Sequence, residues 1–264
     1  MSAERRLDGR VALVTGAASG NGRAIALRFA REGAAVLCAD LQEAPLAEGW
    51  DEGLPTHEAI AAEGGVARFA RCDVTDGEQV RAAVETAVRE LGRLDVAVAN
   101  AGISPRSADL IVDEPWEQYE RVVSVNQHGV WWTCREAVRQ MLAQGGGGRV
   151  IVVASAAGLV GTPTGIDYNT SKGAAVQLVR TLAGQVGRYG ITVNAICPGY
   201  VRTAMTRIIW DDPERLARVS EATPFNRLGE AEDVAGAAFW LASDDAAWVT
   251  GIALPVDGGL TCVR

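Results

Sequence analysis

A glycine-rich turn between two short apolar runs limits this chain to few folds. The first run is 11–15, the turn is 16–22, and the second run is 35–40. Apolar residues at helical spacing lie between the turn and the second run, which predicts a strand, a helix and a parallel strand. Glycines at such a turn let the backbone approach a pyrophosphate, and the N-terminus of the helix attracts negative charge. The turn therefore predicts a dinucleotide site, although its spacing is G-x-x-x-G-x-G rather than G-x-G-x-x-G.

Strand and helix patterns then alternate along the chain. The alternation predicts an α/β fold, a Rossmann-like doubly wound parallel sheet of about seven strands with helices on both faces. We expect a single domain over residues 1–264. Asp76 is expected to cap one helix and Asp167 another. The further strand patterns are 66–72, 94–99, 150–154, 191–197 and 252–256, and the further helical patterns are 58–62, 76–91, 113–144, 168–188 and 231–241.

Glycine and polar residues follow the ends of the predicted strands. Because the carboxyl ends of parallel strands meet at one edge of a sheet, these residues should lie together. Asp40 ends the second strand, where a carboxylate can accept hydrogen bonds from both hydroxyls of an adenosine ribose. The residues expected at this edge are 16–22, Asp40, Asp73, Asn100, Ser155 and Pro198.

Ser155, Tyr168 and Lys172 form a candidate proton-transfer site. Tyr168 and Lys172 are four residues apart and share one helix face, and Lys172 is the single lysine among 25 basic residues. A phenol has a pKa near ~10, which a neighbouring positive charge lowers. A serine hydroxyl can bind the oxygen of a carbonyl or an alcohol. The set predicts proton transfer at a substrate oxygen without a metal ion or a covalent nucleophile.

Composition argues against several classes of protein. The formal net charge is −8 and no basic tract occurs, so nucleic acid is not an expected partner. The first residues form no apolar signal segment and no run reaches membrane-spanning length. We therefore expect no membrane partner and a cytoplasmic protein. The five cysteines are scattered without a C-x-x-C pair, which indicates buried reduced thiols.

Four motifs resemble those of the short-chain dehydrogenase/reductase family, in its compact single-domain branch. Residues 15–22 resemble the T-G-x-x-x-G-x-G cofactor loop of that family, and residues 100–102 resemble its N-A-G element. Residues 168–172 resemble its Y-x-x-x-K pair, and residues 198–199 its P-G motif. The resemblance extends over nearly the whole chain.

The resemblance implies a role for each candidate residue. Tyr168 would be the general acid and base, and Ser155 would orient the reacting oxygen. Lys172 would hold the nicotinamide ribose and lower the pKa of Tyr168, while Asn126 would help to position a water-linked proton relay. Asn21 stands where an aliphatic residue is more usual. The implied cofactor is NAD, no metal site is expected, and the residues implied to bind NAD are Gly16, Ser19, Gly20, Asn21, Gly22, Asp40, Leu41, Asp73, Val74, Asn100, Ala101, Gly102, Tyr168, Lys172, Pro198, Gly199, Val201 and Thr203.

Two further segments have expected roles. Residues 200–224 mix apolar and charged residues and predict a partly helical flap over the substrate, here called the lid. Residues 41–57 predict a loop, longer than the family minimum, beside the adenosine or in a subunit contact. Many members of the family are tetramers, so the resemblance implies a homotetramer. The expected substrate pocket is mainly apolar, with a wall of Ile103, Ala156, Leu159, Thr162, Pro163, Tyr200, Met205 and Trp210.

Three functions fit this pattern. The first is an NAD-dependent oxidoreductase that moves a hydride between nicotinamide and a secondary alcohol or ketone of medium size. The second is an NADPH-dependent 3-oxoacyl-thioester reductase, against which Asp40, Leu41 and Ser19 argue, because none of them is a cation for a 2'-phosphate. The third is a dinucleotide-sensing protein without turnover, against which the intact Ser155, Tyr168 and Lys172 argue.

Overall fold

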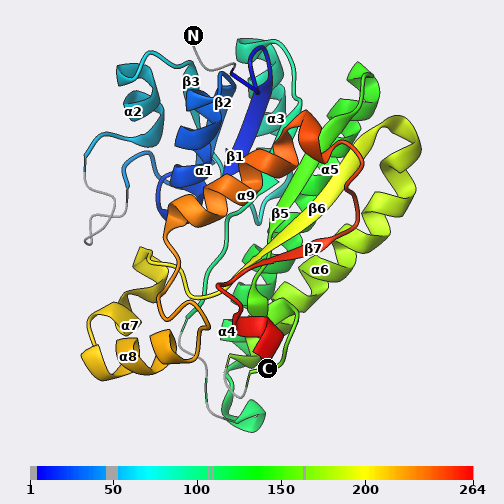
Figure 1. Ribbon diagram of the computed structural model, residues 1–264. Helices are drawn as coiled ribbons and strands as arrows, with labels where there is room; N and C mark the ends of the chain where they lie inside the picture. The colour runs from blue at the N-terminus through cyan, green and yellow to red at the C-terminus, as the bar shows by residue number, and fades with distance from the viewer. Residues whose placement is uncertain (1–4, 46–52, 106–107, 109, 163–164, 264) are drawn as a thin grey trace.

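The computed structural model describes residues 5–45, 53–105, 108, 110–162 and 165–263. Its strands form one parallel sheet in the order β3-β2-β1-β4-β5-β6-β7 (Figure 1). The predicted doubly wound parallel sheet of about seven strands is confirmed. The strands are β1 Val11–Thr15, β2 Ala35–Asp40, β3 Ala67–Arg71, β4 Val96–Ala99, β5 Gly148–Val153, β6 Ile191–Pro198 and β7 Ala253–Val256.

Helices cover both faces of this sheet (Figure 1). Side chains of α1, α2 and α9 bury one face, and side chains of α3, α5 and α6 bury the other. The α-helices of the described residues are α1 Gly20–Arg31, α2 Thr56–Ala62, α3 Gly77–Leu91, α4 Trp116–Val123, α5 Gly129–Gln144, α6 Ile166–Val186, α7 Arg207–Trp210, α8 Pro213–Glu221 and α9 Ala231–Ala242.

The central strands are mainly apolar because both of their faces are buried. In β1, Ala12 and Val14 pack toward α1 and α9, while Leu13 packs toward α3. Successive strand residues point to opposite faces, so a strand between two helical layers reads as a continuous hydrophobic run. This pattern explains why the sequence identifies β1, β4 and β5 without any alternation of polar residues.

The strand order changes direction at β1, which lies between β2 and β4. In open sheets of this kind, ligands bind outside the carboxyl ends of the strands at such a switch point. The glycine-rich turn follows β1 and the N-A-G element follows β4, so both predicted motifs lie at this point.

One prediction about a helix cap is confirmed, and another needs correction. Asp76 caps α3 as predicted, because its carboxylate accepts a hydrogen bond from the N–H of Glu78 at 2.9 Å. Asp167 is not a cap: α6 begins at Ile166 after Gly165, whose φ is 76°, and Asp167 lies buried within the first turn. A glycine at positive φ turns the chain into the helix there, so the cap position falls two residues earlier than predicted.

The long predicted helix at 113–144 begins instead at Trp116 and contains a π-helical segment. This segment, Ser124–His128, joins α4 to α5, and the N–H of Gly129 donates to the carbonyl of Ser124, five residues back. A π-helical turn widens a helix locally and often marks a functional position. Asn126 lies at the centre of this one.

The segment predicted as a loop over 41–57 is shorter at its far end, because α2 already begins at Thr56. The Thr56 hydroxyl donates to the carbonyl of Ala17 at 2.7 Å and thereby ties α2 to the glycine-rich turn. Residues 46–52 lie outside the described part of the chain.

Among the described helices, none has the length and apolar character that crossing a bilayer requires.

Two glycine substitutions should change stability in opposite directions. A Cβ at Gly22 would lie 2.0 Å from the carbonyl oxygen of Gly16, so Gly22→Ala should destabilise the fold by about 1–3 kcal/mol through overpacking. A Cβ at Gly184 in α6 meets nothing within 4 Å, so Gly184→Ala should stabilise it by roughly 0.5–1 kcal/mol. Urea unfolding checks both, and a Gly22→Ala protein as stable as wild type would show that the turn is not tightly packed.

Candidate active site

Asn100 holds the glycine-rich turn in place. Its Nδ2 donates to the carbonyls of Thr15 at 2.9 Å and Gly16 at 3.1 Å, and its backbone N–H donates to the Thr15 hydroxyl at 3.0 Å. Gly16 has a φ of +66°, and a Cβ there would lie 2.8 Å from the Cα of Ala101. The turn after β1 and the N-A-G element after β4 are therefore one packed unit, which only glycine permits at position 16.

The N-terminus of α1 suits an anion. Ser19 precedes the helix but makes no side-chain capping bond, and the first turn contains no acidic residue. The positive end of the helix dipole attracts negative charge. At Gly20, a Cβ would lie 3.2 Å from Cγ2 of Thr203, so the start of the lid touches this turn. A close, glycine-lined backbone at a positive helix end fits the pyrophosphate of a dinucleotide.

Asn21 departs from a purely apolar packing at the same turn. Its Oδ1 is buried and has no hydrogen-bond partner in the described structure. A buried unsatisfied carbonyl costs about 1–3 kcal/mol. Such an oxygen at the cofactor turn is available to accept a hydrogen bond from a bound group.

Asp40 lies at the end of β2 against the same turn. Its Oδ2 accepts from the N–H of Ala18 at 2.9 Å, and its Oδ1 accepts from the N–H of Leu41 at 2.7 Å. These bonds fix a half-buried carboxylate beside the turn. Burial raises the pKa of the Cys38 thiol in the same strand to about 12, an effect that Arg23 opposes and Asp40 reinforces.

The other residues predicted around an adenosine lie near this corner. The backbone N–H of Cys72 donates to the carbonyl of Asp40 at 2.7 Å, which places the end of β3 next to β2. Val74 is buried, and a Cβ at Gly129 would lie 2.6 Å from its Cγ2, whereas the Leu41 side chain is 54% exposed. Asp73 accepts hydrogen bonds from the N–H and the hydroxyl of Thr75.

Lys172 places a buried ammonium at the end of β5. Its side chain is almost completely buried, and Nζ donates to the carbonyl of Val153 at 2.9 Å. A Cβ at Gly102 would lie 3.4 Å from Nζ and 3.2 Å from Oδ1 of Asn126. Nζ lies 5.6 Å from the centroid of the Tyr168 ring. The N-A-G element, which carries Gly102, and the Y-x-x-x-K pair of Tyr168 and Lys172 thus converge, as the strand ends predicted.

Burial controls the ionisation of both groups. It lowers the pKa of Lys172 from 10.5 to about 8. It also raises the pKa of Tyr168, an effect that a hydrogen bond with Ser155 opposes and the Cys197 thiol reinforces. Loss of water around the phenol outweighs the hydrogen bond with Ser155, so the pKa of Tyr168 lies above its ordinary value. The lowering of this pKa by Lys172 stays a prediction.

The Asn126 side chain forms hydrogen bonds with the loop that follows β4. Its Oδ1 accepts from the N–H of Ile103 at 2.8 Å, and its Nδ2 donates to the carbonyl of Ile103 at 2.9 Å. The same Nδ2 is 3.2 Å from the hydroxyl of Ser171, which donates to the carbonyl of Tyr168 at 2.7 Å. Sequence reasoning missed Ser171, although its position one helical turn after Tyr168 was an available signal.

Cys197 is a second residue that the sequence did not single out. It is fully buried at the end of β6, and the backbone N–H of Ser155 donates to its sulfur. Burial raises the pKa of Cys197 to about 11, so the thiol is neutral at physiological pH. Four of the cysteines are buried as predicted, but Cys262 is exposed.

The lid is partly helical, as predicted, and contains α7 and α8. Its first residues are tied to the segment that follows the lid: the N–H of Arg202 donates to the carbonyl of Gly229 at 2.8 Å, and Val201 pairs with Gly229 in a parallel bridge. The Arg202 guanidinium lies 4.6 Å from the centre of the Trp210 ring. At its base, the N–H of Gly199 donates to the carbonyl of Val256 at 3.1 Å, which ties the P-G motif to β7.

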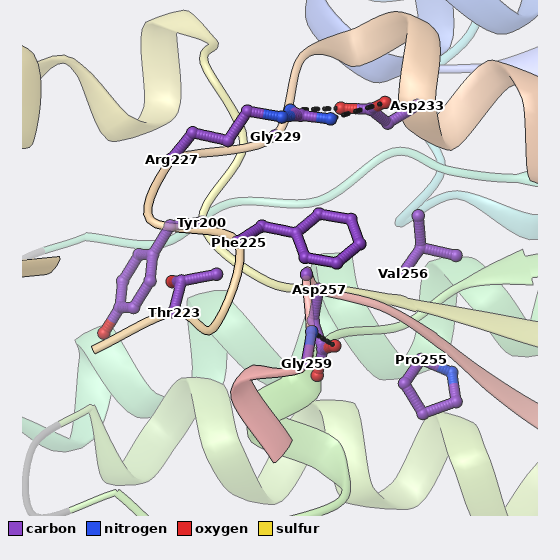
Figure 2. Close-up of a pocket in the computed structure, with 11 residues that line it drawn as sticks. Tyr200, Thr223, Phe225, Arg227, Gly229, Asp233, Pro255, Val256, Asp257 and Gly259 are labelled. Carbon is purple, nitrogen blue, oxygen red and sulfur yellow. Dashed lines mark hydrogen bonds and ion pairs between the residues drawn. The ribbon is translucent and has the colours of Figure 1, made fainter. Parts of the chain in front are cut away.

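A pocket of about 270 Å³ lies beneath the end of the lid (Figure 2). Phe225, Pro255 and Val256 supply apolar surface, and the Arg227–Asp233 ion pair closes one side. Tyr200 is the one residue of the predicted substrate wall among those that line it. Pro163, also predicted in that wall, lies outside the described residues.

Known proteins resemble both this sequence and this fold. A family model described as "Enoyl-(Acyl carrier protein) reductase" matches residues 16–261. A crystal structure of a short-chain type dehydrogenase/reductase from Mycobacterium marinum is 36% identical, with a TM-score of 0.89 over 98% of each chain. This chain belongs to the short-chain dehydrogenase/reductase family. Its motifs at the ends of β1, β4 and β6 and in the first turn of α6 are therefore those of a family of oxidoreductases.

Members of the short-chain dehydrogenase/reductase family with different substrates resemble the chain to similar degrees. The 2-(R)-hydroxypropyl-CoM dehydrogenase of Xanthobacter autotrophicus is 41% identical over 255 residues, 96% of this chain and 99% of that protein. A gluconate 5-dehydrogenase from Burkholderia cenocepacia, crystallised with NADP and tartrate, is 34% identical, with a TM-score of 0.89 over 98% of each chain. These likenesses establish a nicotinamide dinucleotide as the cofactor of the family, without fixing NAD or NADP.

Lys172→Met should stabilise the protein at neutral pH in the absence of cofactor. Because the pKa of Lys172 is about 8 when folded and 10.5 ordinarily, the unfolded chain binds more protons between these values, and wild-type stability rises with pH there. The advantage of the variant should be largest below pH 8 and shrink by about 2 kcal/mol between about pH 7 and about pH 9.5. Urea unfolding of both proteins across this range checks the difference, and a pH-independent advantage would contradict the buried ammonium.

Proposed function

We propose that this protein is an NAD-dependent dehydrogenase of secondary alcohols that also reduces the corresponding ketones. The observation that carries the proposal is the convergence of Ser155, Tyr168 and Lys172 beside a turn that fits a dinucleotide pyrophosphate. Bound NAD would supply the hydride acceptor, and its reduced form the donor. The residues of the chain then have to bind the dinucleotide, orient the substrate oxygen and move one proton.

Tyr168 would move the proton. Its hydroxyl shares a hydrogen bond with Ser155, so a substrate oxygen placed against both groups would be oriented by Ser155 and would exchange its proton with Tyr168. With a pKa of about 8, Lys172 remains mostly protonated at neutral pH. Its charge would favour the phenolate during proton transfer, although it does not lower the ground-state pKa of Tyr168 below the ordinary value.

The lid would cover the substrate, and the single domain over 1–264 would include it. Arg202, near its start, is hydrogen-bonded to Gly229 just beyond its end, and Thr203 lies against the turn at Gly20. Motion of this segment would therefore open or close the cleft beside the dinucleotide. A mainly apolar wall of Ile103, Tyr200, Met205 and Trp210 would favour a medium-sized, moderately hydrophobic substrate.

The proposed cofactor choice depends on Asp40. Two backbone N–H groups hold its carboxylate at the end of β2, where it would accept hydrogen bonds from the adenosine ribose. A 2'-phosphate would replace one donor with negative charge. Two like charges about 4 Å apart at an effective dielectric near ~20 repel by about 4 kcal/mol. Even about 2.7 kcal/mol corresponds to roughly 100-fold, so we propose NAD over NADP.

The NADPH-dependent 3-oxoacyl-thioester reductase remains the second candidate, because the matching family model is described as a reductase of an acyl carrier protein substrate. The cation that could serve a 2'-phosphate is Arg23, whose Nη1 donates to the Thr56 hydroxyl at 3.0 Å beside the glycine-rich turn. Sequence reasoning found no such cation, since it considered only positions 19 and 41. At this corner of the site, Asp40 would therefore favour NAD and Arg23 would favour NADP.

Kinetics with both cofactors and a panel of secondary alcohols test the proposal. Wild type should show about 100-fold higher kcat/KM with NAD than with NADP. Asp40→Ala should lose most of that ratio, through weaker use of NAD and better use of NADP. Arg23→Ala is the matched control and should leave the wild-type preference for NAD unchanged or larger.

Equal use of both cofactors by wild type, with loss of NADP use in Arg23→Ala, would contradict the placement of Asp40 and favour the NADPH-dependent reductase. No turnover of any alcohol or ketone with either cofactor would favour a dinucleotide-sensing protein.

We also propose a cytoplasmic homotetramer. Trp131 on α5 is 53% exposed and Leu142 on the same helix is 43% exposed, so this helix carries apolar surface that a subunit contact would bury. The solution mass by light scattering checks the assembly.

A further inference from the structure

Two neighbouring side chains form hydrogen bonds with the backbone N–H and the backbone carbonyl of Tyr168. Its N–H donates to Oδ1 of Asp167 at 2.7 Å, and its carbonyl accepts from the Ser171 hydroxyl at 2.7 Å. The N–H groups in the first turn of a helix have no partner within the helix, so Asp167 satisfies one that would otherwise be unpaired. The position of the phenol depends on this backbone, because a side chain that has settled in its rotamer moves with its Cα.

The hydrogen bond at the N–H of Tyr168 is the first of a series that extends to a loop distant in the sequence. Oδ2 of Asp167 accepts from Nε2 of Gln118 in α4 at 3.4 Å, and the same amide donates to Oε1 of Glu114 in a short hydrogen bond. The other carboxylate oxygen of Glu114 accepts from the N–H of Ala108 at 2.7 Å. The Asp167 side chain is completely buried. Two carboxylates and one amide thus connect the first turn of α6 to the loop that follows β4.

The bond to the carbonyl leads to the same loop. Ser171, also completely buried, accepts from Nδ2 of Asn126, and Asn126 binds both backbone groups of Ile103. Ile103 begins the loop that Ala108 continues. The loop is therefore tied at two points, and both ties end on the backbone of Tyr168.

We propose that Glu114, Gln118 and Asp167 are positioning residues that couple the loop after β4 to Tyr168. The proposal rests on the proposed function for its catalytic consequence, because Ile103 would contact the substrate and Tyr168 would exchange its proton. A substrate that displaces this loop changes the position of the phenol, so the loop selects substrates by their effect on proton transfer as well as by contact. Buried polar groups are costly unless all are paired, which explains why loss of one member disturbs the others.

Hydrogen–deuterium exchange tests the coupling without turnover. Glu114→Ala removes the acceptor of Ala108, and Glu117→Ala, at an exposed acid three residues later, is its matched control. In Glu114→Ala, amides of 166–170 should exchange roughly fivefold to tenfold faster, as loss of about one hydrogen bond predicts, together with those of 103–113. Gln118→Met should do the same with Glu114 intact. Faster exchange confined to 103–113 in both variants, or an equal change in Glu117→Ala, would overturn the proposal.

Kinetics then test the consequence for substrate. In Gln118→Met, kcat/KM for the best alcohol should fall by roughly 10–100-fold, the effect of a small displacement of a reacting group, while the dissociation constant of NADH, measured by fluorescence titration, stays within about twofold. A lower melting temperature with unchanged kcat/KM would show a purely structural role and overturn the proposal. Absence of turnover in wild type would refute the proposed function instead, and the exchange result would still decide the coupling.

Discussion

The burial of the Lys172 ammonium against the carbonyl of Val153 is the interaction on which the rest of the site depends. It joins the end of β5 to α6 and places Nζ 3.4 Å from where a Cβ at Gly102 would lie. A buried cation is costly unless it is hydrogen-bonded, and burial accordingly lowers the pKa of Lys172 to about 8. Apart from Lys172 and the histidines, all basic residues of this chain are arginines. The compact ammonium of its single lysine therefore lies where the strand ends converge.

Burial also affects Tyr168, whose charged form is an anion, whereas the charged form of Lys172 is a cation. Burial disfavours both the ammonium and the phenolate, so it lowers the pKa of Lys172 to about 8 and raises the pKa of Tyr168 above its ordinary value, and the two values move apart. The buried charge of Lys172 lowers the stability of the fold, because a methionine at position 172 would fill the same space without a charge.

Much of this arrangement could be predicted from the sequence, because parallel sheets bring all their strand ends to one edge. The motifs at Gly16, Asn100, Ser155 and Pro198 each follow a strand, and that alone indicates their convergence. The role of Asp167 could not be predicted, because a carboxylate before a helix looks the same whether it caps the helix or lies buried against another one.

The ionisation of Tyr168 also lay beyond the sequence. The i, i+4 spacing identifies Lys172 as a neighbour, but the pKa depends on how much water the whole fold excludes. The break at Ser124–His128 likewise has no local signal, since Asn126 there binds a loop more than twenty residues earlier in the chain.

The most direct test of this account compares wild type with Tyr168→Phe in the transfer of deuterium from a carbinol-deuterated secondary alcohol to the nicotinamide ring. Wild type should form deuterated NADH. Tyr168→Phe, which keeps the ring but loses the hydroxyl, should bind NADH as tightly and transfer deuterium roughly 10²–10⁴-fold more slowly, the usual contribution of a general acid–base. Transfer by Tyr168→Phe at the wild-type rate, with NADH bound equally well, would show that the proton moves through another group and would contradict the account.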